Sequence, residues 1–234
     1  MTEIIVALDV DTLGQAEELL HRLHGTISFY KVGMRLFTAH GKRAVDLVRR
    51  FDGKVFLDLK LFDIPQTVSD AVRQAQHLGV QSVSLHLWGG GEMLKAATSV
   101  RPRPKLWGVT VLTSLSPDDL RFLHPGLELE NLASRLARLG KTHRMDGIIC
   151  SPHEVQSLSQ ALGGDTCFIT PGIRPAQTIP DDQRRVMTPQ QAARLGIRYL
   201  VIGRPITKAP DPLREAQDIL ADIKQAAPKS LEAP

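Results

Sequence analysis

The feature that most constrains the fold is a regular alternation of short apolar runs with amphipathic stretches along the whole chain. The amphipathic stretches, for example TLGQAEELLHRL, RLFTAHGKRAVDLVRR and TVSDAVRQAQHL, carry apolar residues at three- and four-residue spacing, which predicts helices. Strands that alternate with helices form parallel sheets. Eight of the apolar runs have the length and composition of buried strands: residues 4–9, 27–32, 54–60, 82–88, 106–112, 147–150, 167–170 and 199–203.

Eight strand–helix repeats in 234 residues predict a single α/β domain, a closed (β/α)8 TIM barrel. We expect the barrel to span residues 1–226, with its last helix around Pro212–Ala226, and residues 227–234 to form a frayed tail. An open, doubly wound sheet is the alternative. So many regular repeats favour closure, and the glycine motif of dinucleotide-binding sheets, GxGxxG, is absent.

Composition excludes several other classes of protein. Hydrophobic residues make up 42% of the chain and charged residues 23%, which is typical of a globular domain and excludes a disordered one. No apolar run is long enough to cross a bilayer, and no signal peptide precedes the first strand, so we expect no membrane partner. Cys150 and Cys167 lie in strand-like runs without companion zinc ligands, which indicates a reducing, cytoplasmic compartment and no metal.

The positive charge of the chain is concentrated in one segment. The net charge is +4, but the segment from Pro171 to Lys208 carries +5 and the remainder −1. Such a local excess suits a small anion, and no aromatic RNA-binding motif accompanies it, so we expect no nucleic-acid partner. The segment holds two acids, Asp181 and Asp182, and seven bases: Arg174, Arg184, Arg185, Arg194, Arg198, Arg204 and Lys208.

Charged residues occur where the first three predicted strands end. The first ends in Asp9, the second carries Lys31 near its end, and the third ends in Asp58 and Lys60. Barrel enzymes carry their chemistry at the carboxyl ends of the strands. Asp58 and Lys60 are two residues apart and leave the strand on the same face, with Asp63 just beyond. A structural ion-pair network is one interpretation; the other is a lysine that its carboxylate neighbours keep protonated, as a proton donor requires.

The last two strands are followed by segments that suit a phosphate. The seventh continues into PGIRP and the eighth into IGRPIT. Glycine lets backbone N–H groups approach an anion, a helix start adds its dipole, and arginine binds phosphate oxygens in a bidentate manner. Phosphate sites after strands seven and eight recur in barrels of this kind.

The segment LDLKLFDIPQTV resembles the signature of the orotidine 5′-phosphate decarboxylase family, in which Asp-x-Lys-x-x-Asp-Ile-Pro-x-Thr is the catalytic segment. The resemblance covers nearly the whole chain, through ALDV, FYKVG, HLWGGGEML, VTVLTS, PGIRP, DQRRVMTP and YLVIGRPIT in that order. It implies a homodimeric barrel that converts orotidine 5′-monophosphate (OMP) to uridine 5′-monophosphate (UMP) and carbon dioxide without a cofactor. That reaction is the last step of de novo pyrimidine nucleotide biosynthesis.

The resemblance also implies roles for individual residues. Lys60 would protonate C6 of the base, and Asp58 would lie against the substrate carboxylate. Lys31 and Asp9 would hold the ribose hydroxyls. The implied catalytic residues are Lys60, Asp58, Asp63 and Lys31. Asp63 and Thr67 would reach the partner's site, and Thr113 or Ser116 would contact the pyrimidine. The phosphate side would be formed by Arg174, Gln183, Arg204 and the Gly203 amide, with residues 174–187 as a lid. Ile64 and Pro171 are further implied substrate contacts.

Two other functions remain open on the sequence. A Mg²⁺-dependent enzyme of the 3-keto-gulonate-6-phosphate decarboxylase or hexulose-phosphate synthase type shares the Asp-x-Lys strand but lacks DIPxT. A non-catalytic barrel that binds nucleotides or RNA would need no buried alternation of acid and lysine. Asp58, Lys60 and Asp63 therefore favour the decarboxylase.

Overall fold

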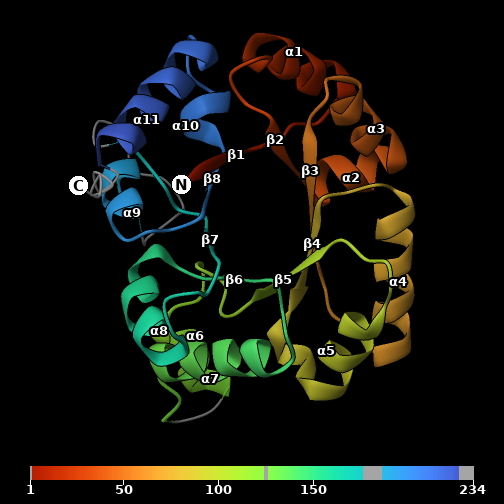
Figure 1. The fold of residues 1–234 in the computed structure, drawn as a ribbon, viewed down its shortest axis with the longest axis vertical. Helices are drawn as coiled ribbons and strands as arrows, with labels where there is room; N and C mark the ends of the chain where they lie inside the picture. Colours follow the sequence, from red (N-terminus) through yellow and green to blue (C-terminus); the bar gives the residue numbers. More distant parts are fainter. Residues whose placement is uncertain (1, 124–125, 176–185, 227–234) are drawn as a thin grey trace, which may run out of the picture.

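The computed structural model describes residues 2–123, 126–175 and 186–226 of the chain, and within these ranges eight parallel strands close into a barrel (Figure 1). Each strand pairs with the next along the chain, and β1 also pairs with β8, with Val6 opposite Ile202. The predicted single-domain barrel is confirmed, and the doubly wound alternative is wrong. The strands are β1 (Glu3–Ala7), β2 (Phe29–Gly33), β3 (Lys54–Leu61), β4 (Ser82–His86), β5 (Lys105–Val109), β6 (Gly147–Ile149), β7 (Phe168–Thr170) and β8 (Tyr199–Ile202).

The helices form a ring around the strands (Figure 1). The last of them has the predicted bounds, and the tail expected at residues 227–234 lies outside the described residues. No helix in the described ranges is long and apolar enough to cross a membrane. The helices are α1 (Leu13–Leu23), α2 (Met34–His40), α3 (Lys42–Arg50), α4 (Pro65–His77), α5 (Gly90–Ser99), α6 (Pro117–Leu123), α7 (Leu129–Thr142), α8 (Val155–Leu162), α9 (Pro189–Arg194), α10 (Arg204–Thr207) and α11 (Pro212–Ala226), with 3₁₀ turns η1 (Leu87–Gly89) and η2 (Pro152–Glu154).

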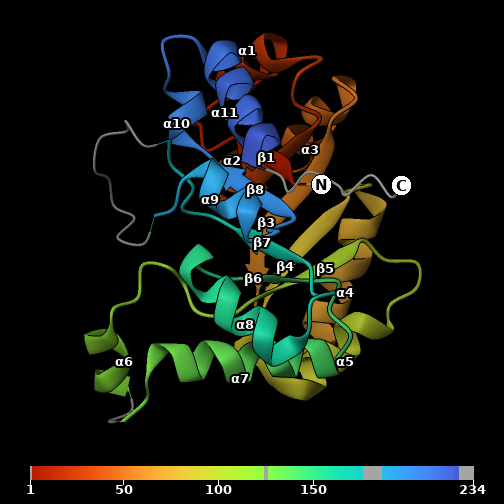
Figure 2. The ribbon, with the colours of Figure 1, turned by 60° about the vertical axis from the view of Figure 1, so that its left-hand side comes forward.

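Three predicted strands end two or three residues earlier than expected. β1 ends at Ala7 and not at Asp9, β4 at His86, and β5 at Val109, so that Asp9 and Thr113 lie on the loops beyond. The apolar character of each run continues past the last ladder bond, which is why the pattern overestimates the strands. The loop after β5 also holds α6, which the pattern did not predict and which projects away from the ring (Figure 2).

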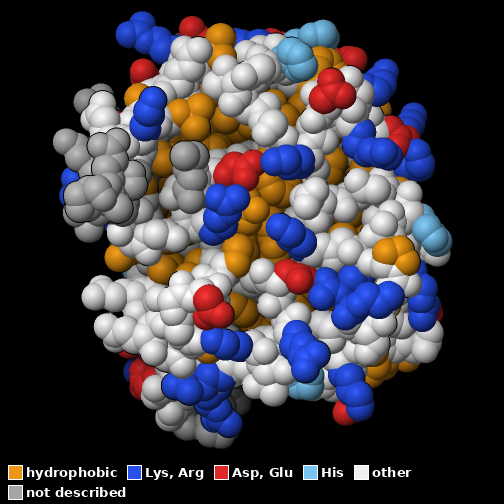
Figure 3. Space-filling view, viewed as in Figure 1, with side chains coloured by type: hydrophobic (Ala, Val, Ile, Leu, Met, Phe, Trp, Pro, Cys, Tyr) orange, Lys and Arg blue, Asp and Glu red, His pale blue; other side chains and the backbone are white. Residues whose placement is uncertain are grey.

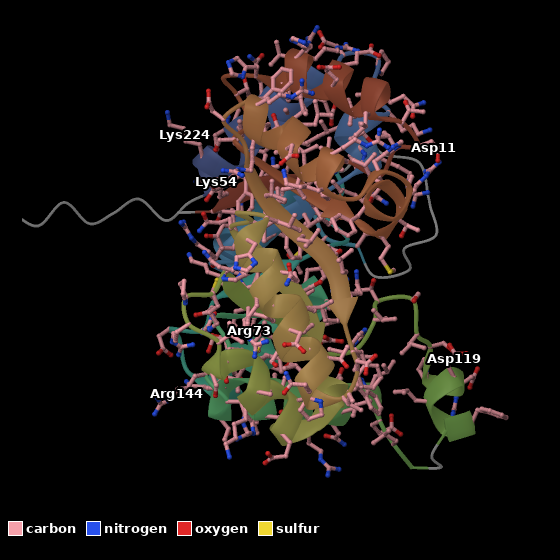
Figure 4. All side chains as sticks on the ribbon, turned by 90° about the vertical axis from the view of Figure 1, so that its right-hand side faces the viewer. Asp11, Lys54, Arg73, Asp119, Arg144 and Lys224 are labelled. Atoms are coloured by element: carbon pink, nitrogen blue, oxygen red, sulfur yellow. The ribbon has the colours of Figure 1, made fainter. Side chains whose placement is uncertain are left out.

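Aromatic side chains fill the amino-terminal half of the barrel. Phe56 and Tyr199 pack on Trp107, with ring centroids 4.6 Å and 5.1 Å apart respectively. Closer to the amino-terminal end, at the starts of β1 and β3, Glu3 accepts a hydrogen bond from Lys54 at 3.2 Å. Figure 3 looks onto this end, where charged side chains of both signs lie around the barrel axis. Figure 4 shows Lys54 at this end and Asp11 at the opposite end, where a cavity opens.

The stretch predicted as one helix after β2 is broken into α2 and α3 at Gly41. This glycine has φ 55° and ψ −136°, a backbone conformation that residues with a Cβ rarely adopt. Its N–H still caps α2 by donating to the Phe37 carbonyl at 2.7 Å. The break turns the chain so that α3 can pack beside α1.

Replacing Gly41 by Ala should lower the free energy of unfolding by about 1–3 kcal/mol, because the strain of this backbone conformation is the main cost. A Cβ at Gly41 would meet no other atom within 4 Å, so steric overlap is not the cause. The matched control is Gly14→Ala, in the exposed first turn of α1, where alanine should stabilise the fold by about 0.5–1 kcal/mol. Denaturant unfolding of both variants measures the difference, and equal effects would contradict the assignment of strain to Gly41.

Candidate active site

A cavity of about 640 Å³ opens at the carboxyl-terminal end of the barrel. Residues that follow six of the strands, far apart in the sequence, line it together. This is the position in which barrel enzymes bind their substrates. Nine of the sequence-predicted site residues line the cavity: Asp9, Lys31, Asp58, Lys60, Thr113, Pro171, Arg174, Gly203 and Arg204.

Four of these residues form a chain of alternating charge. The Lys31 ammonium lies 2.8 Å from Asp9 Oδ1 and 3.7 Å from Asp58 Oδ2. The Lys60 ammonium donates to both oxygens of Asp58, at 2.9 Å each. Lys31 and Asp58 are each only 8% exposed, so their pairing offsets the cost of removing both charges from water.

The electrostatics of the cluster keep Asp58 ionised. Burial alone would raise the pKa of this carboxyl group. The positive charges of Lys31 and Lys60, with hydrogen bonds from Lys60 and Ser84, outweigh burial and hold the pKa below its ordinary value. At neutral pH the site therefore presents a fixed carboxylate between two ammonium groups.

The backbone at Lys60 is not that of a regular strand. The register of β3 against β4 shifts between Leu57 and Leu61, and Lys60 has φ 50°, in the left-handed region. The Lys60 N–H donates to the hydroxyl of Ser84 on β4 at 2.9 Å, and that hydroxyl donates to Asp58 Oδ1 at 2.7 Å. Ser84 is not among the site residues predicted from the sequence. The alternation in SVSLH, which places Ser82, Ser84 and His86 on one face of the strand, was the available signal.

His86 lies beside this cluster at the end of β4. Burial, followed by the charge of Lys60, lowers the pKa of the imidazole, so it is neutral at physiological pH. Its Nδ1 is buried and has no hydrogen-bond partner among the described residues, and its ring centroid lies 5.9 Å from that of Phe62. His86 therefore packs against Phe62, and its Nδ1 makes no hydrogen bond to the cluster.

The basic segment from Pro171 to Lys208 divides between two places. Arg174, Arg204 and Lys208 line the cavity, whereas Arg198 lies near Glu3 at the amino-terminal end, 3.9 Å between their charged groups. Arg194, at the end of α9, is not a lining residue. Arg184, Arg185 and the predicted phosphate ligand Gln183 lie outside the described residues.

The two ends of the predicted lid, residues 174–187, are joined by backbone hydrogen bonds. The Arg174 N–H donates to the Met187 carbonyl at 3.0 Å, and the Met187 N–H donates to the Gly172 carbonyl at 3.1 Å. The chain thus leaves and re-enters the barrel at one point beside the cavity. Residues 176–185 themselves lie outside the described ranges.

Three predicted site residues, Asp63, Ile64 and Thr67, do not line the cavity of their own chain. All three are exposed, and Asp63 Oδ1 accepts a hydrogen bond from the Ile64 N–H at 2.6 Å. Of the two candidates for the pyrimidine contact, Thr113 lines the cavity, whereas Ser116 does not and donates to Asp119 at 2.6 Å.

The cavity also has polar lining residues that were not predicted from the sequence, on the side of α1, α2 and α10. Arg35 donates to both carboxylate oxygens of Asp11, at 2.6 Å and 2.5 Å, and to the Asp9 carbonyl at 3.1 Å. These bonds tie the loop after β1 to α2. No group of three or more His, Cys, Asp or Glu side chains in the described ranges is arranged to hold a metal ion.

A closed (β/α)8 barrel with this charged cavity at the carboxyl ends of its strands defines a TIM-barrel enzyme. Residues 2–219 match the model of the orotidine 5′-phosphate decarboxylase / HUMPS family. A protein of Moorella thermoacetica named orotidine 5′-phosphate decarboxylase is 45% identical over 233 residues, which are 95% of this chain and 92% of that protein. A protein of the same name from Trichlorobacter lovleyi is 44% identical over 228 residues, with 94% and 95% covered.

Solved structures agree with these sequence matches. The crystal structure of orotidine 5′-phosphate decarboxylase from Lactobacillus acidophilus superposes with a TM-score of 0.83 at 36% identity, covering 95% of this chain and 99% of that one. The enzyme of the same name from Pyrococcus horikoshii, at 23% identity and a TM-score of 0.78 over 94% of this chain and 99% of that one, shares the fold. The chain belongs to the orotidine 5′-phosphate decarboxylase / HUMPS family and is a carboxy-lyase, as the sequence predicts.

Proposed function

We propose that the protein decarboxylates OMP to UMP and carbon dioxide, the last step of de novo pyrimidine nucleotide biosynthesis, with Lys60 as the proton donor to C6. The observation that carries the proposal is the alternating chain Asp9–Lys31–Asp58–Lys60 inside the cavity. The family and the names of the relatives supply the substrate.

The chemical step needs only groups of the protein. The bond between C6 and the carboxylate carbon breaks, the electron pair stays on C6, and carbon dioxide leaves as a neutral molecule. The Lys60 ammonium lies where negative charge develops, stabilises it, and transfers its proton to C6. Asp58 holds Lys60 in place through two hydrogen bonds and repels the substrate carboxylate, a repulsion that the loss of carbon dioxide relieves.

The rest of the cavity would bind the parts of the nucleotide that do not react. In this proposal Lys31 and Asp9 hold the ribose hydroxyls, Thr113 contacts the pyrimidine, and Arg174, Arg204 and the Gly203 amide bind the phosphate. Contacts far from the reacting carbon contribute to the rate when they close the site around the transition state. Ile64, Pro171 and Gln183 complete the expected contacts, with residues 174–187 as the lid.

A homodimer would bring the residues that lie outside the cavity into a site. Asp63 and Thr67 are exposed beside Phe62 and Ile64, which are 62% and 66% exposed. Met34 after β2 and Trp88 after β4 are also exposed, so this apolar set follows three adjacent strands at the end that bears the cavity. Large apolar side chains gathered on one surface favour an interface between subunits, across which Asp63 and Thr67 would reach the partner's cavity.

The proposed activity predicts loss of the ultraviolet absorbance of OMP when the protein is added in the presence of a chelator. The Lys60→Ala variant should be slower by at least roughly 1,000-fold, because it lacks both the proton and the stabilising charge. Absence of turnover by the wild-type protein would contradict the proposal. Turnover of a sugar phosphate that stops on chelation would favour the Mg²⁺-dependent alternative.

Replacing Arg204 by Ala should reduce kcat/KM for OMP by roughly 10- to 100-fold, because the variant loses charge-assisted hydrogen bonds to the phosphate. On orotidine, which lacks the phosphate, the same variant should act like wild type. The matched control is Arg194→Ala, which removes an equal charge from the same basic segment outside the cavity. Equal losses on both substrates would instead make Arg204 a structural residue.

The shared-site dimer predicts that two inactive variants restore each other. Lys60→Ala and Asp63→Ala subunits, mixed, unfolded and refolded together, form mixed dimers in which one site lacks both residues and the other is intact. Since random pairing makes half of the dimers mixed, activity should return to roughly a quarter of that of refolded wild type. Each variant refolded alone is the control. If Asp63 served its own subunit, mixing would restore nothing.

A further inference from the structure

Ser84 is a completely buried serine on β4, with 0% of its surface exposed. Its hydroxyl accepts a hydrogen bond from the Lys60 N–H at 2.9 Å and donates one to Asp58 Oδ1 at 2.7 Å. One oxygen atom is therefore bonded to both members of the pair at the centre of the site. Ser84 does not line the cavity, so it would touch no substrate.

The backbone of Lys60 needs support from outside its own strand. A left-handed conformation is unfavourable for a residue with a side chain and persists only where the surroundings hold it. The ladder between β3 and β4 is interrupted from Leu57 to Leu61, and the Ser84 hydroxyl receives the Lys60 N–H in that interruption. Without this acceptor the partly buried N–H would lose its partner on β4, and the left-handed turn would lose the contact that holds it there.

The carboxylate of Asp58 needs a donor that fixes its orientation. Lys60 donates to both oxygens at 2.9 Å, an arrangement that requires the plane of the carboxylate to face the ammonium. Ser84 donates to Oδ1 from the neighbouring strand, and Lys31 approaches Oδ2 at 3.7 Å from β2. The hydroxyl is a short, directional contact on one oxygen, whereas the lysines are flexible side chains.

We propose that Ser84 is a positioning residue for the decarboxylation. Through one hydroxyl it sets the left-handed backbone of Lys60 and the orientation of the Asp58 carboxylate, and so directs the Lys60 ammonium at the reacting carbon. This inference rests on the proposed function. It gives β4 a role in catalysis, although no residue of β4 lines the cavity.

The test compares Ser84→Ala with Ser82→Ala on OMP. Ser82 lies two residues earlier on the same face of β4, is equally buried, and its hydroxyl has no hydrogen-bond partner among the described residues. Ser84→Ala should lower kcat by roughly 10- to 100-fold, as expected for a displaced catalytic group. Its KM for OMP and its affinity for UMP should change by less than about 3-fold, because the ribose and phosphate contacts remain. Ser82→Ala should match wild type in both.

Two further variants separate positioning from folding. Ser84→Thr keeps the hydroxyl and should recover most of kcat. Ser84→Cys keeps a side chain of similar size with a weaker donor, and its kcat should lie between those of Ser84→Thr and Ser84→Ala. This variant replaces Ser84→Ala in the test if the alanine variant does not fold. The inference is overturned if folded Ser84→Ala, or Ser84→Cys in its place, keeps kcat within about 2-fold of wild type, or if kcat and KM change together. Wild-type protein without turnover would overturn the proposed function itself.

Discussion

The buried carboxylate of Asp58 is the constraint around which the site is built. A carboxylate at this depth stays ionised only where positive charges and hydrogen-bond donors replace water, and removal of one partner from such a group costs about 3–5 kcal/mol. Three strands contribute these partners: Lys31 from β2, Lys60 from β3 and Ser84 from β4. Asp9, from the loop after β1, in turn pairs with Lys31. The burial of Lys31 and Asp58 therefore depends on the correct pairing of β2, β3 and β4.

The alternation of apolar runs with amphipathic stretches is sufficient to predict the barrel, because the strands are buried on both faces and the helices on one. It was not sufficient for the details that shape the site. Asp58 and Lys60 do lie together, as two-residue spacing predicted, but Lys60 occupies a bulge with positive φ and not a regular strand position. That conformation depends on an acceptor on β4, a contact between segments 24 residues apart, which no local pattern reveals.

Charged residues that are close in the sequence do not all lie at the same end of the barrel. The net charge of the basic segment after β7 predicts one anion site, yet Arg198 lies near Glu3 at the start of β1, the opposite end of the barrel from the cavity. A segment that runs through a helix and the next strand visits both ends of the barrel, so its net charge is divided between them. Asp63 shows the converse case, since it follows Lys60 closely but lies outside the cavity that Lys60 lines.

The aromatic packing of Phe56, Trp107 and Tyr199 affects how molecules enter and leave the cavity. These rings fill the barrel on the amino-terminal side of the cavity, and the cavity opens at the carboxyl-terminal end. In the proposed reaction the nucleotide would enter and leave by that opening, and carbon dioxide formed at the base of the cavity would pass beside the bound nucleotide or follow it out. In the proposed reaction, substrate and product nucleotides would compete for this one cavity, so accumulated product would slow turnover.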